Sequence, residues 1–502
     1  MFQQRELVFE AGLFANRSKR ASKSRWVDGN FVRFRDGVPA QTGGWRTIPL
    51  TGIAITGRPC GLLSWRPNNQ SGRFAVIGTH SNAFLFDGSS VSTIKPVDMV
   101  VGRLEAVAGQ GYGVGLYNAE AYGTQRSAVG DILDAATWTF DMFGEILLGC
   151  FSGDGKIRKY LNGTDAALVT VAGAPTARAI CMSAERHLFA FGCNGNPRLV
   201  QWSDRESFTV WGPLVTNRAG SYEMQVYSPF QCARRVQGSV MAWTETEVVA
   251  FSPSFNATVY SRETVTEEVG ACGPLAVCVV AERGGEVAYW MGSDGIFIFD
   301  GIVRRMECDL QDFIYKDVNL AQKSKFEVAA NLEFSEIRFS YCSAASIEID
   351  RCVVLCLTNM AWSKAHISRT VWMDRQVFPK PLALDAAGIV YEHETGVLGG
   401  GVALPSFILS HPLTIGVGQS FTDVSAFWPD LEETAQQVDV SFVTRDYSGD
   451  VDLVHGPVRC GGDTEKVDFY FSGRQVQLKL QGVGTHWEIG VPLIEAQEAG
   501  LA

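Results

Sequence analysis

Two short apolar runs on either side of a small polar turn form a unit that recurs along the chain. "GRFAVIGTHSNAFLFDG" at residues 72–88 and "EVAYWMGSDGIFIFDG" at residues 286–301 both end in Phe-Asp-Gly. Phe, Val, Ile, Tyr and Trp fill the runs, while Gly, Asn, Asp and Ser bound them, which is typical of β-hairpins. Each unit therefore predicts two antiparallel strands joined by a tight turn.

The same unit occurs elsewhere, at spacings of roughly 35 to 55 residues that are typical of four-stranded propeller blades. Further copies lie at residues 145–163, 187–204, 239–253, 336–359 and 382–396, with a weaker one at 111–123. Because one hairpin cannot bury its apolar face alone, stacked blades must cover one another. We therefore expect an all-β fold, with a β-propeller of about six to seven blades over residues 55–398. The alternative is an irregular all-β protein in which similar turns recur through turn chemistry alone.

The two flanks of the repeats differ from them. Residues 1–54 carry a basic stretch and predict an extended N-terminal arm that docks on protein. Residues 399–502 begin with a glycine cluster and continue with strands of period two, such as "QVDVSFVTRD", which predicts a small C-terminal β domain resembling a sandwich. The main helical candidates are residues 130–138 and 309–332.

Composition narrows the class of protein. Apolar residues make up 46% of the 502 residues, which indicates a globular chain, and 43 basic against 54 acidic residues give a net charge of −11. This charge argues against a general nucleic-acid-binding surface. No secretion signal or membrane-spanning run is seen, so we expect a protein soluble in the cytoplasm. The twelve cysteines form no CxxC pair, and we expect buried free thiols rather than zinc ligands or disulfides.

Motifs for catalysis do not match. "GCFSGDGKI" at 149–157 has the wrong glycine spacing for a phosphate-binding loop, and "GQGYGVG" at 109–115 lacks the third glycine of the dinucleotide pattern. The seven histidines are scattered and no serine lies in a GxSxG elbow. Four aspartates invite comparison with glycosidase signatures, but we expect them to be turn formers: Asp87, Asp154, Asp294 and Asp300. We predict no enzyme, no cofactor and no bound metal.

The basic stretch holds the candidate contact residues. They are Arg17, Lys19, Arg20, Lys23, Arg25, Trp26, Arg33 and Arg35. Such residues could contact DNA phosphates or an acidic partner subunit, and a solvated arm is the plain alternative. Trp26, Phe31 and Phe34 favour docking on protein, because aromatic anchors dominate interfaces.

Three segments resemble one family. "WVDGNFVRFRDGVPAQTGGW" at 26–45 resembles the opening of the tail hub, or nozzle, proteins of short-tailed bacteriophages (podoviruses), also called packaged-DNA stabilisation proteins. The segment from "QGSVMAWTETEVVAFSPS" (237–254) through "VGACGPLAVCVVAERGGEVAYWMGSDGIFIFDG" (269–301) is similar to the middle of these proteins, and "RQVQLKLQGVGTHWEIGVPLIE" (474–495) to their closing strands. The resemblance is architectural and brings no catalytic signature.

The resemblance implies a structural virion protein with a propeller and no cofactor. Its subunits would form a homo-oligomeric ring, usually a hexamer, below the adaptor and portal proteins of the head-to-tail connector. The ring would retain packaged double-stranded DNA and conduct it on ejection without sequence-specific binding, and tail fibre or plug proteins could attach. The protein would be assembled in the bacterial cytoplasm and reside in the virion tail. The alternatives are a non-catalytic propeller binding module and a cytoplasmic propeller enzyme such as a glycosidase.

Overall fold

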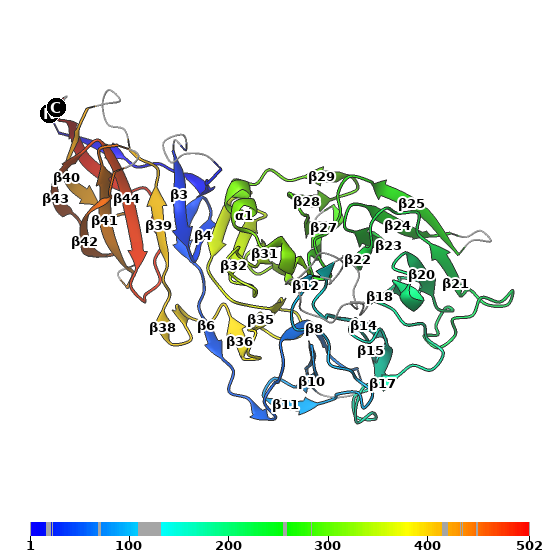
Figure 1. Ribbon diagram of the computed structural model, residues 1–502. Helices are drawn as coiled ribbons and strands as arrows, with labels where there is room; N and C mark the ends of the chain where they lie inside the picture. Colours follow the sequence, from blue (N-terminus) through cyan, green and yellow to red (C-terminus); the bar gives the residue numbers. More distant parts are fainter. Residues whose placement is uncertain are drawn as a thin grey trace, which may run out of the picture.

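The computed structural model consists of a ring of β-sheets with a smaller β-sandwich beside it (Figure 1). It describes residues 2–16, 22, 24–68, 72–108, 132–254, 259–282, 284–413, 420–431, 433, 435–447 and 450–500. Both ends of the described chain lie at the end of the sandwich that is far from the ring.

Seven four-stranded antiparallel units form the ring, and each is one blade of a β-propeller. The innermost strands β8, β14, β18, β22, β26, β30 and β34 contact one another in this order, and β34 returns to β8. The predicted all-β propeller is confirmed, with seven blades. In chain order the blades are β8 (Pro59–Trp65), β9 (Phe74–Thr79), β10 (Ala83–Phe86), β11 (Ser90–Thr93); β14 (Trp138–Phe143), β15 (Ile146–Phe151), β16 (Ile157–Tyr160), β17 (Val169–Thr170); β18 (Ala179–Met182), β19 (Leu188–Phe191), β20 (Leu199–Trp202), β21 (Gly220–Glu223); β22 (Phe230–Val236), β23 (Ser239–Thr244), β24 (Val248–Pro253), β25 (Tyr260–Thr266); β26 (Val277–Glu282), β27 (Gly285–Met291), β28 (Ile296–Phe299), β29 (Val303–Arg305); β30 (Glu327–Asn331), β31 (Glu336–Tyr341), β32 (Arg351–Cys356), β33 (Trp362–Ala365); and β34 (Val371–Met373), β35 (Leu382–Leu384), β36 (Val390–His393) with β6 (Trp45–Thr47).

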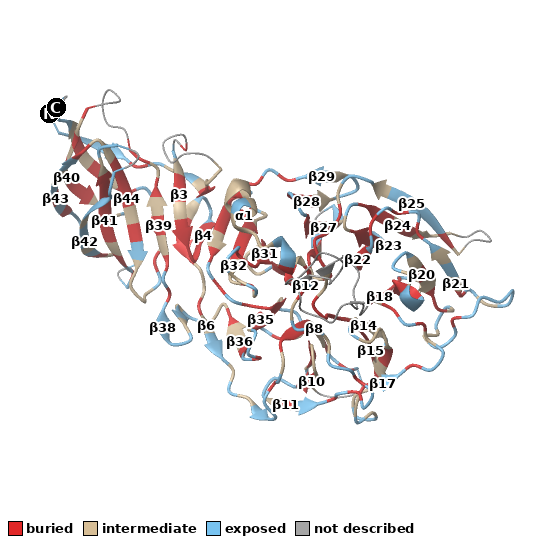
Figure 2. Ribbon diagram, viewed as in Figure 1, coloured by how far each residue is buried: buried red, intermediate tan, exposed pale blue. Residues whose placement is uncertain are grey.

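The hairpins predicted from the sequence are the second and third strands of the blades. Residues 72–88 form β9 and β10, and residues 286–301 form β27 and β28. Each of the other five strong units likewise forms the second and third strands of one blade. The weaker unit at 111–123 lies outside the described residues. These middle strands carry the most buried apolar residues, whereas a fourth strand such as β25 is mostly exposed (Figure 2).

Close packing between blades depends on small residues at the contact. Trp138 of β14 lies against Gly78 of β9, where an added Cβ would come within 2.4 Å of the indole ring. The Trp138 Nε1–H donates to the Thr79 carbonyl at 2.9 Å. A side chain at position 78 would therefore separate the first two blades.

The N-terminal segment closes the ring. β6 pairs antiparallel with β36 as the outer strand of the seventh blade, and β7 (Thr51–Gly52) pairs parallel with β11 of the first blade. A short hairpin of β37 (Leu398–Gly399) and β38 (Val402–Ala403) is attached to β6. The seventh blade is therefore built from residues near both ends of the repeat region.

The sandwich also combines both flanks of the chain. One sheet has the order β1 (Gln3–Glu6), β45 (Leu493–Glu498), β40 (Thr422–Trp428), β43 (Val467–Gly473), and the other β2 (Glu10–Leu13), β3 (Arg25–Asn30), β39 (Phe407–Ser410), β44 (Gln475–Gly482), β41 (Gln437–Arg445), β42 (Leu453–Gly461). A C-terminal β domain is present as predicted. The described part of the predicted N-terminal arm does not extend freely, because β1, β2 and β3 satisfy their backbone hydrogen bonds within these two sheets.

Helices are few. α1 (Gln311–Asp317) and the 3-10 helix η3 (Leu320–Lys325) confirm the first part of the helical candidate at 309–332, whereas its last part is wrong and forms strand β30. The candidate at 130–138 is wrong over its described residues, which contain β13 (Ile132–Leu133), paired with β12 (Val107–Ala108), and the start of β14. No helix within the described ranges is long and apolar enough to cross a membrane. All twelve cysteines are free thiols and ten of them are buried, as predicted.

Candidate functional site

The predicted contact residues that the structure describes lie where the sandwich meets the propeller. Arg25 and Trp26 belong to β3, while Arg33 and Arg35 belong to β4 (Val32–Arg35), which forms a hairpin with β5 (Val38–Gln41). Four others lie outside the described residues: Arg17, Lys19, Arg20 and Lys23.

Arg25 and Trp26 make contacts within the chain. The Arg25 guanidinium pairs with Glu10 at 2.8 Å and with Asp309, which precedes α1 of the propeller. Trp26 is buried, with its ring 4.3 Å from that of Phe9. Both side chains thus pack within the chain, and a contact of Trp26 with another molecule would require this packing to open.

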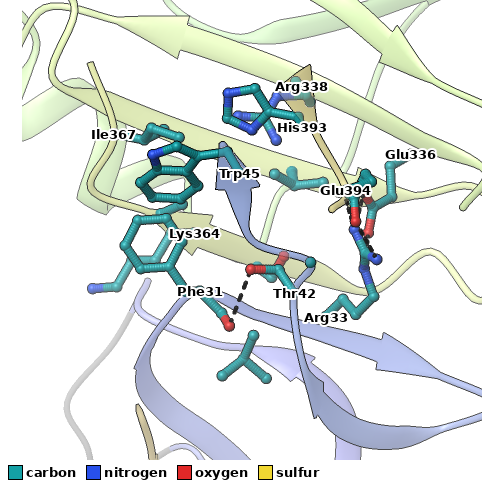
Figure 3. A pocket seen from close by; sticks show the side chains of 15 residues that line it. Phe31, Arg33, Thr42, Trp45, Glu336, Arg338, Lys364, Ile367, His393 and Glu394 are labelled. Atoms are coloured by element: carbon teal, nitrogen blue, oxygen red, sulfur yellow. Dashed lines mark hydrogen bonds and ion pairs between the residues drawn. The ribbon is translucent and has the colours of Figure 1, made fainter. Parts of the chain in front are cut away.

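Arg33 is the centre of a buried charge cluster between the β4–β5 hairpin and blades 6 and 7 (Figure 3). Its Nε and Nη2 donate to Glu336 at 2.9 and 3.1 Å, and its Nη2 and Nη1 donate to Glu394 at 2.7 and 3.1 Å. Asn331 Nδ2 donates to both carboxylates, and the Phe334 ring lies 3.6 Å from the guanidinium carbon. All four hydrogen bonds are charge-assisted, and both carboxylates are bound in bidentate fashion.

Burial alone would lower the pKa of Arg33, but the two carboxylates together raise it above its ordinary value. Burial raises the pKa of Glu336, and Arg33 opposes this rise. The guanidinium is therefore fully occupied by two carboxylates and leaves no unpaired positive charge to attract an anionic ligand. Arg35, on the same strand, is different, because 69% of its side chain is exposed and Asp36 is 4.0 Å away. It is the one described arginine of the predicted set whose side chain remains mostly exposed.

Further hydrogen bonds join hairpin, sandwich and propeller around this cluster. Lys364 Nζ pairs with Asp28 at 2.7 Å, and the His366 amide donates to Asn30 Oδ1 at 2.9 Å. Asn359 Nδ2 donates to the Phe34 carbonyl at 3.2 Å. One continuous hydrophobic cluster also runs from the sandwich core to blades 5 and 6, and it includes Phe442 of β41, Phe34 of β4 and Trp362 of β33. We refer to these contacts together as the joint.

Buried carboxylates on the innermost strands link neighbouring blades. Asp141 of β14 accepts from the Met182 amide of β18 at 2.7 Å, and Thr139 Oγ1 accepts from the Ile180 amide at 3.1 Å. Glu327 of β30 accepts from the Trp372 amide of β34 at 2.6 Å. Burial raises the pKa of both acids, that of Glu327 to about 8. These acids thus hold backbone amides of the next blade.

The turn aspartates divide into two kinds. Asp87 accepts from the Ser89 and Ser90 amides, and Asp154 from the Lys156 amide, as predicted for turn formers. Asp294 and Asp300 pair with Arg305 and Arg304, and Asp154 pairs with Arg158 in addition to its turn contact. Among the residues that the structure describes, no group of three or more His, Cys, Asp or Glu side chains is arranged to hold a metal ion.

The channel between the innermost strands has two mouths. The upper mouth, at the N-terminal ends of these strands, is a cavity of about 280 Å³ lined by Arg103, Asp134, Arg178 and Gln231, among others. The connection between blades 1 and 2 crosses this side, since Ala106 exchanges two hydrogen bonds with Gln322, which precedes blade 6. The lower mouth, at the C-terminal ends, is a cavity of about 610 Å³.

Two arginines of the lower mouth were not predicted from the sequence. Arg234 and Arg235 of β22 line this cavity together with apolar residues from β8, β14, β18 and β26. A signal was present, because consecutive arginines in "FQCARRV" interrupt an otherwise buried strand. Glu336 and Glu394 carried no comparable signal, since their partner Arg33 lies some 300 residues or more away in sequence.

Comparisons with known proteins give distant similarity only. No family model and no curated protein matches the chain. Among solved structures, the Swd1 β-propeller domain of Myceliophteria thermophila is 8% identical and covers 69% of this chain and 99% of its own, with a TM-score of 0.38. An exo-β-1,3-galactanase of Phanerochaete chrysosporium is 11% identical and covers 73% of this chain and 97% of its own, with a TM-score of 0.28. The propeller assignment rests on the strand pairing and not on these similarities.

Proposed function

We propose that this chain is a structural subunit of the tail hub, or nozzle, of a short-tailed bacteriophage, without catalytic turnover. The observation that carries the proposal is the joint, where a continuous hydrophobic cluster and the Arg33 charge cluster fuse propeller and sandwich. A subunit that forms part of a pressurised conduit needs two parts that do not move against each other. The resemblance in sequence adds the ring, of about six copies with closed symmetry.

In this proposal the DNA conduit lies between subunits and not in the propeller. The two mouths of the propeller channel, of about 280 and 610 Å³, have the size of small-molecule pockets. The connection between blades 1 and 2 also crosses the upper mouth. Duplex DNA would instead pass through the centre of the ring, along a face that each copy contributes.

The distribution of charge agrees with a conduit that does not hold DNA tightly. The net charge is −11, and Arg25 and Arg33 of the basic stretch are paired with acids of the same chain. Each phosphate contact made by a lysine or arginine adds affinity, and many of them would delay ejection. The role proposed for the chain is therefore to surround DNA.

The first test is the copy number in purified tailed particles, measured by quantitative mass spectrometry against the major capsid protein. A small fixed number, about six as the resemblance implies, supports a single axial ring. A tail protein of known copy number in the same particles serves as the internal reference. Absence from particles, with the chain left soluble in the lysate, would contradict the proposal and favour the binding-module or enzyme alternatives.

A further inference from the structure

The lower mouth of the propeller channel has the form of a ligand site. Its cavity of about 610 Å³ lies within the usual volume range of small-molecule pockets. Residues of five successive innermost strands contribute to its wall, so the site depends on the closed ring and not on one blade. The apolar part of the wall consists mainly of Leu62, Leu63, Phe140, Met142, Met182 and Val279.

Two positive charges lie in this mouth without a carboxylate partner. Arg234 Nη1 and Nη2 donate only to carbonyl oxygens, those of Ala233 at 2.8 Å and Pro274 at 3.1 Å. The Arg235 side chain forms no hydrogen bond and no ion pair with any described residue. A guanidinium stays protonated throughout the physiological pH range, so both charges are permanent.

The two carboxylates that line the same cavity accept hydrogen bonds from backbone amides and not from the arginines. Asp141 accepts from the Met142 amide at 2.8 Å and from the Met182 amide at 2.7 Å, and burial raises its pKa although both arginines act on it in the opposite direction. Glu286 Oε2 accepts from the Gln237 amide at 2.7 Å. Neither acid forms an ion pair with the two arginines, so both guanidinium groups remain available to an anionic ligand.

The buried arginines of the described chain, in contrast to the half-buried Arg234 and the exposed Arg235, are compensated. Arg58 and Arg158 pair with Glu348 at 2.8 Å and Asp154 at 2.6 Å, respectively. Arg369 lies over the rings of Tyr391 and Trp45, at 3.7 and 5.0 Å. Arg234 and Arg235 have neither a carboxylate nor an aromatic partner of this kind among the described residues. The cavity wall beside them is partly apolar, so water screens their charges less there than in bulk solvent.

We propose that the lower mouth binds an organic carboxylate that carries an apolar or aromatic group. The carboxylate would accept bidentate hydrogen bonds from Arg235 and from the edge of Arg234, because the planar guanidinium matches its geometry. The apolar group would cover Phe140 and Leu62 on the opposite wall. This proposal concerns the inside of one propeller and does not depend on the role of the chain in a tail.

The test uses pairs of probes that differ only in charge. Binding of N-acetylphenylalanine and N-acetylleucine to the full-length protein is measured by isothermal titration calorimetry, next to the corresponding carboxamides. We expect at least one acid to bind with a Kd below about 1 mM and its amide to bind at least about tenfold more weakly. Replacement of Arg235 by Gln should weaken binding of the acid about tenfold, while that of the amide stays unchanged.

The control variant is Arg205→Gln, an exposed arginine of blade 3 that does not line the cavity and should bind the acid as the wild type does. Because Arg235 is exposed, its replacement should leave the melting temperature unchanged, which separates loss of binding from loss of fold. An amide that binds as tightly as its acid, an unaffected R235Q variant, or no detectable binding of either acid would overturn the proposal. None of these outcomes alters the copy number in particles, so the two proposals fail independently.

Discussion

The joint and the lower mouth both contain arginines in a partly apolar setting, but only the arginine of the joint is paired with carboxylates. At the joint, Arg33 makes four hydrogen bonds to two carboxylates that come from different blades. In the lower mouth, the Arg234 guanidinium donates only to carbonyl oxygens, and the Arg235 side chain has no hydrogen-bond or ion-pair partner among the described residues. The arginine of the joint therefore finds its ion-pair partners within the described chain, whereas the two arginines of the mouth do not.

This difference separates structural charge from charge that is available to a ligand. A buried pair contributes little net stability compared with apolar residues, but removal of one partner leaves an uncompensated charge and is costly. An arginine without such a partner can be replaced at little cost to the fold. Stability measurements can therefore assign each arginine to one of the two classes.

The largest effect is expected for Arg33→Met. The substitution would leave Glu336 and Glu394 buried without their cation, and we expect a loss of about 3–5 kcal/mol in the free energy of unfolding. Urea unfolding followed by tryptophan fluorescence measures it. The matched control is Arg35→Met on the same strand, whose exposed side chain should contribute less than about 0.5 kcal/mol.

A combined variant distinguishes lost charge from lost packing. If uncompensated carboxylates are the cause, adding Glu336→Gln and Glu394→Gln to Arg33→Met should recover part of the loss. Equal stability of the wild type and the variant that carries Arg33→Met alone would contradict the view that the joint is held by these charges.

An effect of intermediate size is expected for Glu327→Gln, and it depends on pH. Burial raises the pKa of Glu327 to about 8 from its ordinary value of 4.5. Between these values the folded protein holds a proton that the unfolded chain releases, so the stability from this group is complete below about pH 4.5 and is lost as pH rises through about 8. Glutamine does not titrate and still accepts from the Trp372 amide. The stability of the variant relative to wild type should therefore rise by on the order of 3 kcal/mol from pH 5 to pH 9.

Thermal unfolding at a series of pH values checks this expectation. The exposed Glu267→Gln variant is the control and should follow the wild type at every pH. Parallel curves for Glu327→Gln and wild type would show that Glu327 ionises normally, and that its carboxylate is solvated in the folded protein.

The smallest effect is expected for Arg234→Met. Because no described carboxylate forms an ion pair with this guanidinium, the change in the free energy of unfolding should stay within about 1 kcal/mol. The same urea titration as for Arg33→Met measures it, so that both arginines are compared on one scale. A loss as large as that of Arg33→Met would remove the distinction between joint and mouth, and would assign Arg234 a structural role.

The sequence was sufficient for the parts of the fold that are encoded locally. Each strong hairpin unit has its turn and both strands within some 25 residues, and each was found as the middle of a blade. The first and fourth strands were not identified individually, because short ones such as β18 (Ala179–Met182) and β17 (Val169–Thr170) show little periodicity.

Pairings between distant segments left no local signal. β3 pairs with β39, and Arg33 pairs with Glu394, across several hundred residues. The basic character of residues 17–36 indicated a contact region, but not that Arg25 and Arg33 would find their acids in the same chain. For the lower mouth, the arginines were visible in the sequence, while the cavity exists only because five blades converge.

The closure of the ring by β6 has a consequence during synthesis. Trp45 pairs with His393, 348 residues later in the chain, and at roughly 5–20 residues per second the ribosome needs on the order of 20–70 s to supply the missing strand. The sandwich can be completed only later still, because β1 pairs with β45. A chain that terminates early can complete neither part and keeps open strand edges, which invite chaperones and proteases. Folding thus acts as a check on completeness, because only a chain that has reached β45 can close both the ring and the sandwich.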